Sequence, residues 1–159
     1  MTDDIKDKVE GETSEGATPS LLAEAYIASR GAISDATTRG IRVEVKSSYI
    51  PDRSSPPDSE FFFAYKVKIS NVGSLTAKLV SREWIITDAE GDVERVKGPG
   101  VIGQQPLLPP GGEFEYTSAC PLKTSVGSMY GSYQMVTDDG DRFDAVVAPF
   151  TLAAPNALN

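Results

Sequence analysis

The stretch FFFAYKVKIS at residues 61–70 decides the fold, because its side chains alternate in character along the chain. One side carries the large apolar residues Phe61, Phe63, Tyr65, Val67 and Ile69. The other side becomes polar from Lys66 onward. A period of two is typical of a β-strand with one buried face and one solvated face. Residues 41–46 repeat the period, so both segments are predicted to be strands.

Further segments carry the same signal and are separated by turn-forming residues. Strands are predicted over residues 75–80, 82–87, 92–97, 114–120, 129–135 and 142–147. Hairpin turns are predicted at 88–91 and 138–141, because aspartate close to glycine favours tight turns. About seven or eight strands with little helix indicate an all-β fold, an antiparallel β-sandwich. Trp84 is expected to face the core between the two sheets.

The N-terminal part of the chain differs from this body. Residues 1–17 are charged and poor in large apolar groups, so they are predicted to form a disordered acidic leader. Residues 18–36 are predicted to form a short helix and a linker, and residues 37–159 the sandwich domain. The helix is expected to run from Ser20 to Arg30, because Thr18 and Pro19 form a start signal and Gly31 a stop signal.

One face of the expected helix carries Leu22, Ala25, Tyr26 and Ser29. A helix of this length is marginal alone, so this face has to pack against another surface. Two alternatives are open. The helix lies on its own domain, or it docks on a partner protein.

The composition excludes several classes of partner. The net charge is −8, concentrated toward the N-terminus, and no basic stripe is present, so nucleic acid is not expected to bind. No apolar run approaches the roughly 20 residues that span a bilayer, and no secretory signal pattern is present, so no membrane partner is expected. Cys120 is the only cysteine, which excludes an internal disulfide and a thiolate zinc site. A reducing, cytoplasmic location is expected.

The absence of histidine excludes more kinds of catalytic and metal site than any other feature of the composition. Serine–histidine and cysteine–histidine nucleophile systems are excluded, as are imidazole metal sites. No pair of carboxylates stands out as an acid–base couple. The chain is therefore expected to be non-enzymatic and to need no cofactor.

Six groups of residues between positions 37 and 152 form a recognisable series. They are Tyr49 with Ser54-Ser55-Pro56, Phe63-Ala64-Tyr65 leading to Ile69-Ser70-Asn71, SREWIITD at 81–88, GPGVIGQQP at 98–106, PGGEFEYTS at 110–118 and GSMYGSYQM at 127–135. Because they occur together in this order, the chain resembles the ApaG family.

This resemblance implies an immunoglobulin-like or fibronectin type III-like β-sandwich, in agreement with the strand count. For bacterial members it implies a link to cobalt and magnesium homeostasis without an agreed biochemical activity. Similar domains in eukaryotic F-box proteins and in a polymerase delta-interacting protein look like protein-binding modules. Glu83 stands where many members have histidine, which argues against a metal role at that position.

The glycine-rich loop is the first candidate for a small-molecule site. Gly98, Gly100 and Gly103 have the spacing of a dinucleotide fingerprint, but the prolines that follow exclude the helix that a Rossmann site needs. A nest of backbone N–H groups remains possible without a helix, and the alternative is a tight loop that needs glycine for its backbone. The candidate anion-binding residues are Gly98, Gly100, Gly103, Gln104 and Arg82.

Other chemistry-bearing residues have simpler explanations. The acidic segments 88–92 and 138–141 lack the ligand spacing of an EF-hand, and hairpin geometry accounts for them, so no metal site is assigned. Cys120 shares its strand face with Phe114 and Tyr116, which indicates a buried, inert thiol.

The function expected from these observations is recognition of another protein by the loops of a rigid sandwich. The candidate partner-binding residues are Tyr49, Ser54 and Pro56 in the proline-rich segment. The alternative is binding of a small anion, such as phosphate, pyrophosphate or a nucleotide, or of a divalent cation, at the glycine-rich loop.

Overall fold

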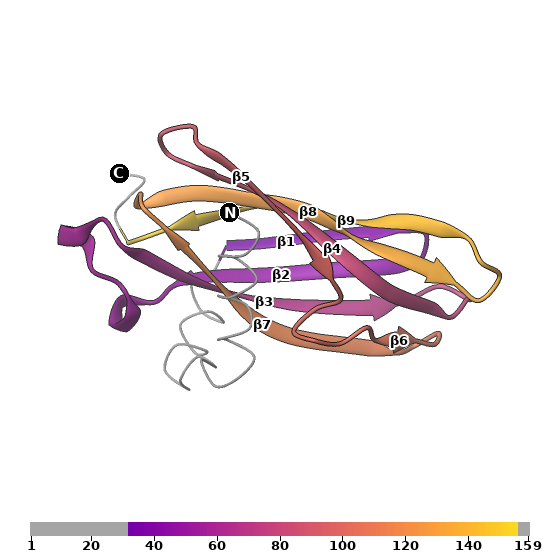
Figure 1. Cartoon of the computed structure of the whole chain (residues 1–159). Coiled ribbons are helices and arrows are strands. Elements are labelled where there is room, and N and C mark those ends of the chain that lie inside the picture. Colours follow the sequence, from indigo (N-terminus) through magenta and orange to yellow (C-terminus); the bar gives the residue numbers. More distant parts are fainter. Residues whose placement is uncertain (1–31, 156–159) are drawn as a thin grey trace.

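The alternating segments form strands, and the strands form two antiparallel sheets packed face to face (Figure 1). The structure is a computed structural model, and it describes residues 32–155. The chain passes between the two sheets several times, so each sheet combines strands that are distant in sequence. This confirms the predicted all-β, antiparallel arrangement.

The first sheet has the strand order β1-β2-β3-β7. Its strands are β1 (Ala32–Thr38), β2 (Ile41–Tyr49), β3 (Phe61–Asn71) and β7 (Glu113–Leu122). The register pairs Val45 with Val67 and then Val67 with Tyr116, so the apolar side chains of neighbouring strands share the inner face.

The second sheet has the order β5-β4-β8-β9, with a short β6 also paired to β4. Its strands are β4 (Ala77–Asp88), β5 (Val93–Pro99), β6 (Leu107–Leu108), β8 (Val126–Thr137) and β9 (Arg142–Ala153). Both predicted hairpins are present, since β4 turns into β5 and β8 turns into β9.

The core lies between the sheets and is centred on aromatic rings. Trp84 is 1% exposed, and its ring lies 5.3 Å from Tyr65 and 6.0 Å from both Tyr133 and Phe150. The Trp84 contacts are close to edge-to-face, an arrangement that adds about 1 kcal/mol per pair to the burial of the rings. The predicted inward position of Trp84 is therefore confirmed.

Several predicted boundaries need correction. Residues 32–36, expected as linker, belong to β1, which pairs with β2 from Ala32 to Thr38. The segments 75–80 and 82–87 form one strand, β4, whose pairing with β8 slips between Leu79 and Ser81. The described residues contain nine strands because β1 and the two-residue β6 join those expected.

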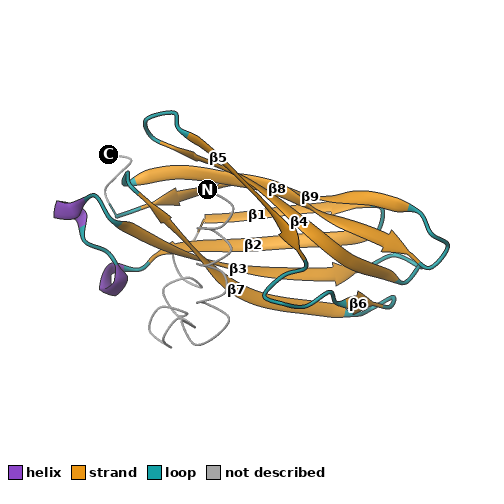
Figure 2. Ribbon diagram, viewed as in Figure 1, coloured by secondary structure: helices purple, strands orange, loops and turns teal. Residues whose placement is uncertain are grey.

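The described helical segments are two short 3-10 turns (Figure 2). They are η1 (Pro51–Arg53) and η2 (Pro56–Asp58) in the proline-rich loop, where no regular element was expected. The helix expected from Ser20 to Arg30 and the acidic leader lie outside the described residues. Within residues 32–155, no helix has the length and apolar character required to cross a membrane.

The two lateral sides of the sandwich differ. On one side β1 and β9 lie close together, and the Val146 backbone N–H donates to Thr38 Oγ1 at 3.1 Å. On the other side the sheets end in β7 and β5, each of which has a paired neighbour on one side only. These two edge strands therefore border the open side of the molecule.

Candidate functional site

The glycine-rich loop is built around Arg82. This residue lies on β4 opposite Gly98 of β5 and is 6% exposed. Its Nη1 donates to the carbonyl oxygens of Pro99 at 3.1 Å and Gly100 at 3.0 Å. A Cβ on Gly98 would lie 2.8 Å from that nitrogen, so glycine allows the guanidinium to lie against the strand. Arg82 thus stabilises the loop from inside.

The backbone amides of this loop face protein carbonyl groups. The N–H of Gly100 donates to Val80 O at 2.8 Å, and the N–H of Val101 donates to Gln104 O at 2.8 Å. The N–H of Gln104 donates back to Val101 O at 2.9 Å. These N–H groups are therefore not available to an anion in this conformation.

The tip of the loop is a two-residue turn. Ile102 and Gly103 both have positive φ angles, 41° and 78°, as a type I′ turn requires. The structure brings Arg82, Gly98 and Gly100 together, whereas Gly103 and Gln104 lie exposed at the tip. The loop geometry thus follows the simpler of the two sequence interpretations, a tight turn that needs glycine.

The residues of the proline-rich loop have different exposures. Tyr49 is 7% exposed, and its ring lies 5.6 Å from that of Phe63. Ser54 Oγ donates to Ile50 O at 2.8 Å and accepts from the Phe62 N–H at 2.9 Å, so it holds the loop closed. Pro56 is exposed in η2. Of the three candidate partner-binding residues, Pro56 is the one that faces solvent.

An acidic group lies at the tip of the β4–β5 hairpin. Asp88, Glu90 and Asp92 each place a carboxylate oxygen within 4.8 Å of the others. The ammonium of Lys123, from the β7–β8 turn, lies 3.7 Å from Asp88 and 3.4 Å from Glu90 and contacts Asp92 directly. The hydrogen bond to Asp92 raises the pKa of Lys123 above its ordinary value. The chain's own cation thus offsets one of the three negative charges of this group.

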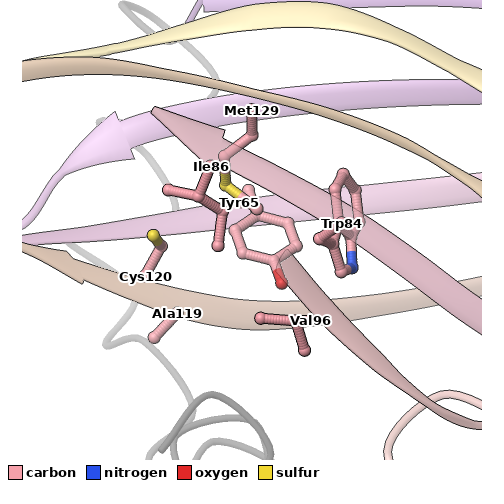
Figure 3. A pocket seen from close by; sticks show the side chains of 7 residues that line it. All are labelled: Tyr65, Trp84, Ile86, Val96, Ala119, Cys120 and Met129. Carbon is pink, nitrogen blue, oxygen red and sulfur yellow. The ribbon is translucent and has the colours of Figure 1, made fainter. Parts of the chain in front are cut away.

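Figure 3 shows a small cavity between the sheets near their open side. Its volume is about 10 Å³, barely enough for one water molecule. It is lined by Tyr65, Trp84, Ile86, Val96, Ala119, Cys120 and Met129. Cys120 is 1% exposed, as predicted for an inert thiol. The cavity is therefore a packing defect of the core and too small for an organic ligand.

On the outer face of the first sheet, charged side chains lie in three rows that run across the strands. Charges of opposite sign in these rows pair with each other. Ion pairs join Lys66 to Glu115 at 3.6 Å and Lys68 to Glu113 at 3.4 Å. At the β1 side Arg42 binds Asp35 through two hydrogen bonds, of 3.0 and 2.6 Å. The hydrogen bond from Arg42 holds the pKa of the Asp35 carboxyl below its ordinary value.

The outer face of the second sheet is different, because β8, one of its two inner strands, exposes no charge. The outward residues of β8 are Ser128, Tyr130, Ser132 and Gln134. Tyr130 is 46% exposed and pairs with Ile85 of β4, while Val146 of β9, also 46% exposed, pairs with Ser132. We call the surface formed by Ile85, Ser128, Tyr130, Ser132, Gln134 and Val146 the Tyr130 face.

One charged side chain lies within the Tyr130 face, because Glu83 of β4 pairs with Ser132, and the other charged residues border the face. On β5, Arg95 Nη1 donates to Glu83 Oε2 at 2.6 Å. On β9, Asp144 pairs with Gln134. Arg95 compensates the charge of Glu83, and a largely uncharged centre with a polar border is the usual anatomy of a protein interface.

Sequence reasoning missed this surface. The signal was present in residues 127–135, where Tyr130 alternates with the buried Met129, Tyr133 and Met135. The exposed neighbours of Tyr130 come from other strands, and their positions depend on a register that one strand does not reveal.

The family model of the ApaG domain matches residues 51–137, which are more than half of the chain. The chain belongs to the ApaG domain family. The matched ApaG region contains the proline-rich loop, the glycine-rich loop and Tyr130. The family resemblance noted in the sequence is therefore confirmed.

The ApaG relatives are similar along most of their length. Protein ApaG of Anaeromyxobacter dehalogenans strain 2CP-1 is 56% identical over 127 residues, which cover 80% of this chain and 100% of that protein. Protein ApaG of Pseudomonas entomophila strain L48 is 51% identical over 119 residues, covering 75% and 94%. The crystal structure of an ApaA protein from Bordetella pertussis has a TM-score of 0.71 at 49% identity, covering 73% and 94%.

Proposed function

We propose that this ApaG-domain protein is a non-enzymatic protein-interaction module that binds its partner through the Tyr130 face. The supporting observation is that β8 presents Ser128, Tyr130, Ser132 and Gln134 to solvent without a charge. Tyrosine is enriched in protein interfaces, because it offers a large contact area at low entropic cost. The proposal moves the binding surface from the loops to a sheet face.

Tyr130 is the residue expected to contribute most to binding. Its ring is half exposed on a rigid strand, and Ile85 beside it extends the apolar contact. Aromatic residues near the centre of an interface dominate binding energy, whereas charged residues at the border contribute less. Arg95 and Glu83 would then set the orientation of the partner.

The non-enzymatic part of the proposal is supported by the residue types present. The chain contains no histidine, and its one cysteine is buried. Lys123 contacts all three carboxylates of the acidic group at Asp88, Glu90 and Asp92, so its ammonium lies where a bound cation would, and the cobalt and magnesium link implied by the family resemblance would act through a partner protein. Ion binding by the chain itself has less support.

The test is capture of proteins from a cell extract by the immobilised full chain, compared with two variants. Tyr130→Ala should reduce the amount of at least one retained protein about tenfold or more, the effect of losing a central aromatic contact. Lys68→Ala, on the charged outer face of the other sheet, should leave that protein's retention unchanged. Near-ultraviolet circular dichroism checks that both variants are folded. Equal retention by all three chains would refute the Tyr130 face as the binding surface.

The alternative of anion or cation binding at the glycine-rich loop is tested separately. The full chain is titrated with pyrophosphate, nucleotides, magnesium and cobalt while backbone amide shifts are recorded. Because the amides of Gly100, Val101 and Gln104 already have partners, no saturable shift is expected at residues 98–104. A saturable shift confined to those residues would favour the alternative.

A further inference from the structure

The outer face of the first sheet has an apolar end beyond its charged rows. The last charged row contains Lys46 and Lys66. The next two rows are Ser48–Ala64–Ala119 and Ile50–Phe62–Pro121, in which each residue lies beside its neighbour across β2, β3 and β7. We call these six residues the alanine patch. It lies on the side of the sheet away from the core, although Ala119 also borders the small cavity between the sheets.

The alanine patch is buried although it faces outward. Ala64 is 1% exposed, Ala119 5%, Ser48 6% and Ile50 7%. Arg53 covers part of it, since its guanidinium lies 4.6 Å from the centre of the Phe62 ring. Among residues 32–155, no strand or helix is stacked over Ala64 and Ala119. Ala119 lies on an edge strand, where neighbouring side chains shield one flank only.

The position of β1 indicates which part of the chain is next to the patch. Ala32, the first residue of β1, pairs with Ser47, which precedes Ser48 of the patch in the chain. Three strand spacings separate β1 from β7, about 14 Å at the usual spacing. A helix from Ser20 to Arg30 would be about 16 Å long at 1.5 Å per residue. The chain that precedes β1 is therefore long enough to cross the whole patch.

The chemistry of this preceding segment is complementary to the patch. Its predicted apolar face carries Leu22, Ala25, Tyr26 and Ser29. Small residues such as Ala64 and Ala119 allow a helix to approach a sheet closely. The positive charges of Lys46 and Lys66 at the border of the patch attract the acidic residues that precede the predicted helix.

We propose that residues 20–30 dock on the alanine patch of their own chain, with Ser29 near Ser48 and Leu22 near Ala119. The first sheet is then covered on its outer side at this end, and the Tyr130 face on the other sheet stays exposed. The proposal selects the first of the two alternatives for the helix and is independent of the proposed function, which concerns the other sheet.

The test uses disulfide formation in the full chain, with Cys120 left in place because it is buried. The pair Ser48→Cys with Ser29→Cys should cross-link at least about tenfold faster than the pair Ser48→Cys with Ile27→Cys, because docking raises the effective concentration of one helix face only. Both pairs have nearly the same chain separation, so an undocked segment would give similar rates. Equal rates would overturn the proposal, and so would cross-links formed mainly between two molecules, which would indicate a second copy as the occupant.

A second measurement protects the test against local misfolding. Hydrogen exchange of residues 20–30 should be slow in the wild-type chain and in Thr117→Lys, which changes the same face of β7 in the charged row. Ala119→Lys places a charge inside the patch and should accelerate exchange of residues 20–30 at least about tenfold, because a buried unpaired charge is costly. Fast exchange of these residues in the wild-type chain would also overturn the proposal.

Discussion

Asn71 shows how one side chain connects three segments. It is 2% exposed at the end of β3. Its Nδ2 donates to Leu75 O at 2.7 Å and to Leu108 O at 2.8 Å, and its Oδ1 accepts from the Gly73 N–H at 3.0 Å. Asn71 therefore holds both the β3–β4 turn and β6 in place.

Replacing Asn71 with alanine is expected to lower the free energy of unfolding by about 3 kcal/mol, because buried carbonyl groups lose their donors. Urea denaturation followed by Trp84 fluorescence measures the change. Asn71→Asp keeps the acceptor for Gly73 and removes both donors, so it should be destabilised as well. Ser74→Ala, an exposed change in the same turn, should stay within about 0.5 kcal/mol of the wild type. A small effect in both Asn71 variants would contradict this account.

The Asp35–Arg42 pair makes a prediction about pH. Because Arg42 lowers the pKa of the Asp35 carboxyl, the pair contributes stability above the carboxyl's unfolded pKa of about 3.9, and this contribution is lost as the pH falls through the folded pKa. Arg42→Gln should raise the pKa of Asp35, as measured by its carboxyl carbon shift during an acid titration. Both groups are solvated, so added salt should reduce the difference. An unchanged midpoint in Arg42→Gln would contradict the assigned cause.

At the scale of elements, β4 and β8 pair so closely that one glycine is required. A Cβ on Gly131 would lie 2.0 Å from Glu83 O and 3.1 Å from the Cα of Trp84. Both contacts are to backbone atoms of the neighbouring strand, which cannot move without disturbing the sheet. Gly131 also follows the point where the pairing of β8 with β9 slips, so the strand is locally irregular there.

Gly131→Ala is expected to lower the free energy of unfolding by more than about 4 kcal/mol or to prevent folding, which is outside the range of ordinary substitutions. Gly103→Ala is the control. A Cβ at Gly103 meets no atom within 4 Å, and its cost is the positive φ alone, about 1 kcal/mol. Thermal unfolding of both variants measures the contrast. Similar melting temperatures would show that the close approach at Gly131 is absent.

The sequence predicts the strands with strong alternation and misses those without it. β3 is visible because Phe63, Tyr65 and Val67 contrast with lysines. β1 has small side chains such as Ser34 and Ala36 on its inner side, so its alternation is weak and it was interpreted as a linker. The slip at Val80 depends on pairing with β8, a contact between segments about 55 residues apart that a local pattern does not contain.

At the scale of the whole molecule, the burial of Cys120 reports on the integrity of the sandwich. It lies on the edge strand β7, opposite Phe63 of β3, and it lines the cavity on the open side. Under native conditions a thiol reagent is expected to label Cys120 only through an opening of the sheets. The labelling rate should therefore rise with urea in parallel with unfolding. Fast labelling without urea would show that reagents enter between β5 and β7 in the native state.

The candidate surfaces were less accessible to sequence reasoning than the fold. Patterns identified the glycine-rich loop, but only the three-dimensional structure shows that Arg82 lies inside it and that its amides are paired. The Tyr130 face and the alanine patch are each assembled from three strands. Their members become neighbours through sheet register, which is set by packing of the whole domain.

The edge strands β5 and β7 on the open side have a consequence for behaviour at high concentration. An unpaired edge invites the edge of another molecule, and long apolar edges nucleate fibrils. β5 carries Glu94, Arg95 and Lys97 along its length and ends at Pro99, while β7 begins with Glu113 and contains Pro121. Charges of both signs and prolines make edge-to-edge growth of a continuous sheet unfavourable, so crowded solutions of this protein should stay free of amyloid-like aggregates.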